Sequence, residues 1–226
     1  MAITINPIYD YQPLSRVNSN GSRHYVDPNN KKLPSVTTVL DSTKDKTFLE
    51  EWKKRVGEAQ AKQISTEAAG LGTLVHTHLE KYILNEDRPT GTNLVHQMAR
   101  SMSDVIIEKG LCHVNEIWGN EVSLYYPDLY AGTTDLVGLY QGEPAIIDFK
   151  NTTKPKKEEW IEDYYLQTVA YALAHNAVYG TNIKRGVILM VARDNTFQLF
   201  DLKDAKFEQM SEKWAERLQQ YYKLNM

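Results

Sequence analysis

The chain has 226 residues, of which 42% are hydrophobic and 24% are charged. This length and composition are typical of one globular domain and exclude a disordered or collagen-like chain. No stretch approaches the roughly 18 apolar residues that a membrane span needs. The single cysteine, Cys112, excludes an internal disulfide framework and a four-cysteine metal cluster. With a net charge of −3 the chain is not a general nucleic-acid coat, so any contact with nucleic acid must be local.

The N-terminal part of the chain has the composition of extended segments and turns. Residues 1–34 are rich in proline, asparagine and glycine. The stretch 33–40 fits either a strand, because it is β-branched, or a short helix with Ser35 near its start. The first thirty residues lack an apolar signal core, and Asp10 and Asp27 are atypical of a transit peptide. We therefore expect a cytoplasmic protein.

Three helices are predicted before residue 110. Thr47 and Glu50 have the spacing of a capping box, which predicts a helix over 47–56. Two longer helices follow at about 66–84 and 94–109, the second of them stopping at Gly110. The residues expected to form their buried faces are Leu71, Val75, Leu79 and Tyr82 in the first, and Val95, Met98, Met102, Val105 and Ile106 in the second.

Strands dominate the second half of the chain. Segments rich in Val, Ile, Leu and Tyr alternate with turn residues, which predicts three consecutive strands and later a hairpin around Asp194-Asn195. A helix precedes the hairpin and another follows it, the last one beginning near Asp204. The order of elements predicts a mixed α/β fold. The predicted ranges are 114–126, 129–140, 144–150, 185–192 and 196–202 for the strands, and 158–179, ending at Gly180, for the earlier helix.

Two aspartates and a lysine are the strongest candidates for chemistry. Asp135 and Asp148 lie on neighbouring predicted strands, and Asp148 ends a run of residues of buried type, where a charge needs a partner. Asp148 and Lys150 are two residues apart and therefore point to one face of the strand. Two carboxylates with an ammonium can hold a divalent cation against a phosphate or a water. Taken alone, the same triplet is equally consistent with an ion pair at the end of a strand.

Two helices present polar residues at intervals of four. Gly72, His76 and Glu80 stack along one face of the predicted helix 66–84, where Gly72 indicates close approach by another backbone or a ligand. His76 could supply an imidazole to a metal, or it could be a solvated histidine. Gln167 and Tyr171 could orient a water or close a pocket, or they could form the polar edge of an aromatic stripe. The lysines after Lys150, which include Lys154 and Lys156, are either a solvated face or a phosphate track.

In order along the chain, these residues resemble a known family. The patterns Gly72-Thr73-x-x-His76-x-x-x-Glu80, Gly132-x-x-Asp135, Asp148-Phe149-Lys150 and Gln167-x-x-x-Tyr171 resemble the PD-(D/E)XK nuclease superfamily, and more narrowly its RecB-like exonuclease branch. The segment 34–40 is similar to one in the mitochondrial genome maintenance exonucleases and their phage and bacterial relatives. The likeness runs from about Pro34 to Asp201. It implies a restriction-endonuclease-like core, a central mixed sheet flanked by helices.

The resemblance also implies roles for the residues. His76, Asp135, Asp148 and the Phe149 carbonyl would bind Mg²⁺ or Mn²⁺, and Lys150 would activate the attacking water. Gln167 would assist, Tyr171 would line the site, and Glu80 and Glu121 are weaker carry-overs, of which Glu121 is left out of the expected site. Ser35, Thr37 and Thr38, together with Lys154 and Lys156, would contact DNA. Residues 1–226 would form one nuclease domain, with 1–45 contributing to the DNA path and 46–226 forming the core.

The leading expectation is a metal-dependent exonuclease acting on single-stranded DNA or strand ends, with recombination or replication proteins as partners. Alternatives are a structure-selective endonuclease and a non-catalytic DNA-binding module of the same fold. A third is an iron site formed by one histidine and two carboxylates. Lys150 argues against that site, because an ammonium beside Asp148 serves phosphate chemistry and has no evident role with oxygen.

Overall fold

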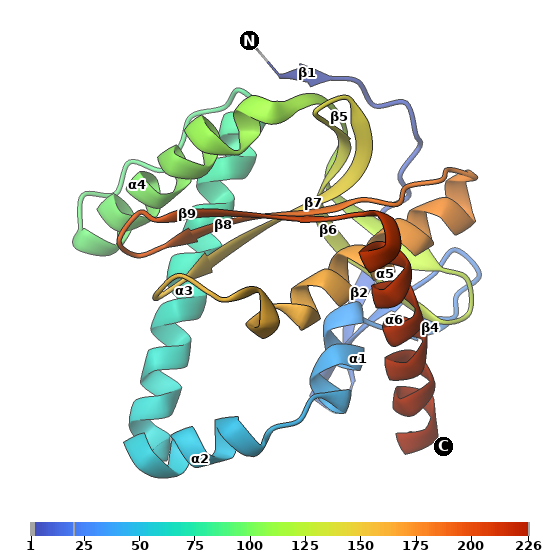
Figure 1. Cartoon of the computed structure of the whole chain (residues 1–226), viewed down its shortest axis with the longest axis horizontal. Coiled ribbons are helices and arrows are strands. Elements are labelled where there is room, and N and C mark those ends of the chain that lie inside the picture. The colour runs from blue at the N-terminus through green and yellow to red at the C-terminus, as the bar shows by residue number, and fades with distance from the viewer. Residues whose placement is uncertain (1–2, 20, 226) are drawn as a thin grey trace.

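A six-stranded mixed sheet lies at the centre of the computed structural model, which describes residues 3–19 and 21–225 (Figure 1). Its strands are ordered β1-β5-β6-β7-β8-β9. The pairs β5–β6, β6–β7 and β8–β9 are antiparallel, while β1–β5 and β7–β8 are parallel. The three consecutive strands and the later hairpin are thus confirmed. The strands are β1 (Thr4–Ile5), β5 (Val114–Tyr126), β6 (Tyr130–Tyr140), β7 (Glu143–Thr152), β8 (Gly186–Ala192) and β9 (Phe197–Leu202).

The parallel pairing of β7 and β8 requires a crossover, which the helix α5 (Glu162–Tyr179) supplies. A short 3₁₀ helix, η2 (Glu158–Trp160), precedes α5, so the helix predicted over 158–179 is interrupted at Ile161. Gly180 ends α5 with a left-handed backbone (φ 66°), as expected of a glycine at a helix C-terminus. The crossover carries Gln167 and Tyr171 beneath the sheet, toward the strands with the two aspartates.

Helices cover both faces of the sheet (Figure 1). On one face α3 (Glu58–Ile83) and α4 (Leu94–Lys109) pack against β7 and β8, followed by the short 3₁₀ helix η1 (Leu111–His113). On the other face lie α5 and the last helix, α6 (Asp204–Leu224). The residues of α6 that are buried against the sheet and α5 are Phe207, Met210, Trp214, Leu218 and Tyr221. Each face therefore has its own hydrophobic cluster, one around Leu79 and Ile147 and one around Leu166 and Trp214. The predicted mixed α/β class is confirmed.

The predicted inner faces of α3 and α4 are only partly right. Leu71, Val75 and Leu79 are buried, as are Met102 and Ile106, but Tyr82, Val95 and Met98 are exposed and Val105 is only partly buried. Helix α3 also begins at Glu58, about two turns earlier than predicted, through residues that are good helix formers but carry no apolar stripe. None of the described helices combines the length and apolarity needed to cross a membrane.

The N-terminal part forms a second sheet, of β2 (Ser15–Ser19), β3 (Ser22–Val26) and β4 (Lys32–Pro34), followed by α1 (Val36–Thr43) and α2 (Thr47–Val56). The stretch 33–40 contains both predicted alternatives, the end of a strand and then a helix capped by Ser35, which accepts from the Thr38 N–H. The predicted capping box at Thr47 is wrong. Thr47 is the first helical residue, and its N–H and hydroxyl both donate to Asp45.

Candidate metal-binding and catalytic site

Strands β6 and β7 separate where the two aspartates lie. Their pairing runs from Tyr140↔Glu143 to Leu136↔Ile147; beyond it β6 pairs with β5 and β7 pairs with β8. Continued by one residue, this register sets Asp135 opposite Asp148. The Phe149 N–H donates to Asp135 Oδ2 at 2.6 Å. The Asp135 carboxylate therefore accepts a backbone N–H of β7 just beyond the described pairing, which fixes it in the opening between the strands.

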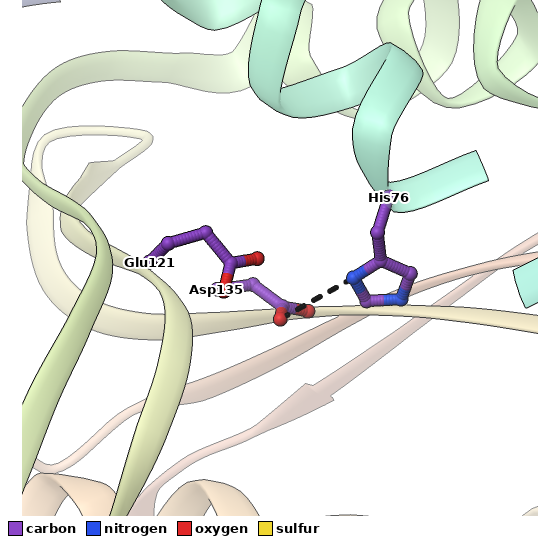
Figure 2. A group of neighbouring side chains, drawn as sticks. All are labelled: His76, Glu121 and Asp135. Atoms are coloured by element: carbon purple, nitrogen blue, oxygen red, sulfur yellow. Dashed lines mark ion pairs between the residues drawn. The ribbon is translucent and has the colours of Figure 1, made fainter. Parts of the chain in front are cut away.

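Glu121 faces Asp135 from the other side. The pairs Asn120↔Leu136 and Val122↔Thr134 flank it, so Glu121, Asp135 and Asp148 form a row across β5, β6 and β7. Ligand atoms of His76, Glu121 and Asp135 all lie within 4.8 Å of one another. Figure 2 shows the imidazole and the two carboxylates converging from α3 and from two strands.

The regular alternation of side chains breaks at this row. Tyr130 and Val137 are an odd number of residues apart on β6, yet both pack in the cluster beneath α5. A strand of period two would send them to opposite faces. Glu121 has a left-handed backbone (φ 51°), which is strained for a residue other than glycine. The local distortion thus falls on the residues that present the carboxylates.

His76 reaches the row from α3. Its neighbours on the helix, Val75 and Leu79, are buried against the sheet, which sets the rotation of the helix. His76 Nδ1 lies 3.5 Å from Asp135 Oδ1. Burial opposes a charge on the ring, yet the Asp135 carboxylate outweighs it and raises the pKa of His76 above its ordinary value. Burial likewise opposes the charge of Asp135, but His76 and Lys150 hold the pKa of that carboxyl below its usual range.

Asp148 is the most buried member of the row, with 2% of its side chain exposed. Burial raises the pKa of Asp148 to about 6, although Lys150 opposes the shift. Lys150 Nζ lies 2.5 Å from Asp148 Oδ2 and 5.1 Å from the centre of the Tyr164 ring. Asp148 nevertheless raises the pKa of Lys150, despite the opposing effect of burial, so the ammonium stays charged.

Glu121 carries a third perturbed carboxyl. Burial and the charge of Asp135 raise the pKa of Glu121 to about 7, and Glu80, one turn along α3 from His76, contributes in the same direction. Glu80 is therefore close enough to Glu121 to repel its charge. A cluster of carboxylates that repel one another in this way is what a bound cation would relieve.

The residues present fit a divalent cation. The donor set is three carboxylates and one imidazole, which suits a hard ion such as Mg²⁺ or Mn²⁺. Asp148 Oδ2 is buried and lies 2.5 Å from the Lys150 ammonium. A buried carboxylate is costly unless a cation offsets its charge, and Lys150 is the cation that does so in the metal-free structure.

Helix α5 supplies the floor of the site. Gln167 Nε2 donates to the Tyr171 hydroxyl at 3.5 Å. Burial raises the pKa of Tyr171 above its ordinary value, so its hydroxyl stays protonated. A Cβ added to Gly132 would lie 2.8 Å from the Tyr171 ring, so only glycine leaves room for this tyrosine. At Gly72 the closely approaching group is the Asn151 side chain, whose Oδ1 would lie 3.0 Å from an added Cβ.

The expected DNA-contacting residues do not join this cluster. Ser35 is buried, and its oxygen accepts from the Thr38 N–H and bonds to the hydroxyls of Thr37 and Thr38. It acts as a helix cap, while Thr37 and Thr38 line a separate polar hollow beside Arg23. Lys154 is exposed and Lys156 half-buried in the loop after β7. Their contact with DNA stays a prediction.

The expected site omitted Glu121, which the structure brings into contact distance of His76 and Asp135. A signal for it was present in the sequence. The turn between β5 and β6 centres on Asp128, and Glu121 and Asp135 are equidistant from that residue. In an antiparallel hairpin such residues face each other.

The fold class defined by this arrangement is shared with a solved structure. The crystal structure of an exonuclease candidate from Eubacterium rectale matches with a TM-score of 0.50 and 13% identity, covering 71% of this chain and 69% of that one. At this identity the likeness concerns the fold alone. It agrees with the expected central mixed sheet flanked by helices.

Curated sequences give a more particular likeness. The mitochondrial genome maintenance exonuclease 1 of Homo sapiens is 29% identical over 203 residues, covering 84% of this chain and 58% of that protein. Its counterpart from Xenopus tropicalis is 27% identical over 214 residues, with 86% and 58% covered. These matches confirm the resemblance drawn from the motifs. The chain spans less than three fifths of the length of these relatives. No protein-family model matches it.

Proposed function

We propose that this chain is a divalent-metal-dependent deoxyribonuclease that hydrolyses phosphodiester bonds as an exonuclease, on single-stranded DNA or at strand ends. The observation that carries the proposal is the convergence of His76, Glu121 and Asp135 next to the buried pair Asp148 and Lys150. The curated relatives support it, because they are named exonucleases.

The roles follow from position and charge. His76, Asp135, Asp148 and the Phe149 carbonyl would hold Mg²⁺ or Mn²⁺, and we add Glu121 to the predicted set. When bound, such an ion acidifies water and offsets charge on the phosphate. Lys150, kept charged by Asp148, would orient the attacking water and stabilise the negative charge that grows on the phosphate oxygens.

Helix α5 and the surrounding surface would complete the site. Gln167 would orient the water or phosphate from below, and Tyr171 would keep the floor closed. The Thr37 and Thr38 hydroxyls, with Ser35 capping the helix that carries them, and the lysines 154 and 156 would contact the DNA backbone. The proposal treats residues 1–226 as one nuclease domain. A cytoplasmic location and partnership with recombination or replication proteins stay predictions.

The test is a cleavage time course on linear and circular single strands in Mg²⁺ and in Mn²⁺, with the linear strands labelled at one terminus only. We expect single nucleotides or short products from linear strands and none from circles, and loss of cleavage in EDTA. Asp148→Ala and Lys150→Ala should each abolish cleavage without abolishing binding.

Other outcomes would overturn the proposal. Circles cut as fast as linear strands would favour the structure-selective endonuclease. Strand binding without cleavage, in either metal, would favour the non-catalytic binding module. Cleavage that persists in both variants would show that the chemistry lies elsewhere.

A further inference from the structure

A large aromatic side chain stands in solvent ten residues after Lys150 in the sequence. Trp160, in η2, is 59% exposed, whereas Trp118 and Trp214 are buried. Leaving an indole ring in water forfeits the stabilisation that its burial would give, and tryptophan is common at binding surfaces. Lys157 Nζ lies 5.4 Å from the centre of the Trp160 ring. An exposed π-face beside an ammonium is the combination that binds a nucleobase and its phosphate.

The segment that carries Trp160 is held in place. The Gln198 side chain on β9 accepts from the Lys156 N–H at 2.7 Å and donates to the Lys156 carbonyl at 2.8 Å. Thr152 donates to the Lys154 carbonyl, and the Trp160 N–H donates to the Lys157 carbonyl. A surface ordered before binding loses less conformational entropy when a ligand arrives.

The same segment leads directly from the catalytic residues. It begins after Lys150 on β7 and ends in α5, where Tyr164 contacts the Lys150 ammonium. Trp160 precedes Tyr164 by four residues, across the break at Ile161 that separates η2 from α5. A short segment thus joins Trp160 to the side chain that contacts Lys150.

The charges around Trp160 favour a polyanion on its lysine side. Among the described residues, Lys154 and Lys156 form no ion pair. Two of the nearby acidic residues are already engaged, because Glu158 pairs with Lys206 and Glu162 pairs with Lys213. Glu159 lies 3.8 Å from Lys157, a loose and exposed pair that a phosphate could displace.

We propose that Trp160, with Lys154 and Lys157, forms a stacking platform for the bases of a single nucleic-acid strand that runs to or from the active site. This inference rests on the proposed nuclease function and adds to it a binding residue outside the motifs. Stacking on Trp160 would be tolerant of base identity, because every base has a π-face.

The first test is strand affinity, measured as the fluorescence anisotropy of a fluorescein-labelled oligothymidylate in EDTA. Trp160→Ala should weaken binding about tenfold, and Trp160→Phe should restore most of it because the phenyl ring keeps a stacking face. Leu224→Ala is the matched control, since Leu224 is 63% exposed at the end of the last helix. It should bind like the wild type.

The salt dependence separates stacking from charge. The slope of log affinity against log salt should fall by about 0.7 in Lys157→Ala and stay unchanged in Trp160→Ala. Equal affinity of Trp160→Ala and wild type would overturn the platform. So would a phenylalanine variant as weak as the alanine variant, or a change of oligomeric state at unchanged strand affinity, which would assign Trp160 to a protein contact.

Cleavage assays distinguish failure of the platform from failure of the proposed function. In Mg²⁺ we expect Trp160→Ala to raise KM about tenfold with kcat nearly kept, because the ring acts on binding. If the wild type cleaves strands and Trp160→Ala has the same KM and the same strand affinity, the platform is refuted and the nuclease function stands. A wild type that binds strands through Trp160 but cleaves none would refute the nuclease function and support the platform.

Discussion

Replacing Asp148 with asparagine should abolish activity and at the same time stabilise the metal-free protein. Burial raises the pKa of Asp148 from 3.8 to about 6, so the fold favours the protonated form. Each pKa unit corresponds to about 1.4 kcal/mol, and the charge of Asp148 therefore costs the metal-free fold about 3 kcal/mol above pH 6. Because the pKa of Asp148 is higher in the folded state than in the unfolded state, the fold avoids this cost below about pH 4. The corresponding stability is lost as the pH rises through 6. Asparagine keeps the shape and removes the charge.

Urea unfolding in EDTA measures this effect. At pH 8, the free energy of unfolding of Asp148→Asn should be about 1–3 kcal/mol higher than that of the wild type. This difference should shrink toward zero at pH 4. Added Mg²⁺ should stabilise the wild type more than the variant, because the variant offers one carboxylate fewer. The cleavage rate in Mg²⁺ should fall by about a hundredfold or more.

The matched control is Asp201→Asn. Asp201 lies on β9 and accepts two hydrogen bonds from the buried guanidinium of Arg185. The Asp201 side chain is 26% exposed, against 2% for Asp148, so its charge costs the fold less than its pairing with Arg185 returns, and this variant should be less stable than the wild type. If Asp148→Asn also proves less stable at pH 8, or if its effect does not depend on pH, the argument that burial penalises the Asp148 charge is refuted.

Glu121→Gln should raise the Mg²⁺ concentration for half-maximal cleavage about tenfold or more, and an unchanged metal titration would remove Glu121 from the site. Gly132→Ala should lower the free energy of unfolding by about 1–3 kcal/mol, because its Cβ would meet the Tyr171 ring. Gly70→Ala, in open space on α3, should raise the free energy of unfolding by about 0.5–1 kcal/mol. Urea unfolding in which Gly132→Ala is the more stable of the two variants would contradict both predictions. Burial lowers the pKa of His175 to about 4, so up to about 3 kcal/mol of stability should be lost as the pH falls from 6.5 to 4. Urea unfolding at pH 7 and 5 should show about 2 kcal/mol of this loss in the wild type and none in His175→Asn.

Local patterns predicted most of the sheet and the strand that carries Asp148 and Lys150. The period of a strand is a local property, so placing Asp148 and Lys150 on one face needed no knowledge of the fold. The turn residues at Gln141 and Gly142, both with positive φ, fixed the hairpin that brings Asp135 beside Asp148. What these patterns did not contain was the separation of β6 from β7, which depends on how each strand pairs with its outer neighbour.

The spacing of apolar residues on a helix does not reveal how much of that helix the sheet covers. Val95 and Met98 continue the apolar stripe of α4, and the sequence alone predicts their burial. In the structure they line an open hollow between α3 and α4, together with Leu74 and Arg193. The buried residues of α4 run from Ala99 to Ile106, so its first turn is left uncovered, and this boundary is set by tertiary packing that no helical period records.

The break in strand pairing accounts both for the geometry of the site and for the stability that the fold loses by forming it. Where β6 and β7 part, a backbone N–H becomes available to hold Asp135. The same opening gathers three carboxylates, whose repulsion and burial raise the pKa values of Glu121 and Asp148. Lys150 and His76 offset only part of that charge. The metal-free fold is therefore less stable than its core would allow, and a bound cation would relieve that repulsion.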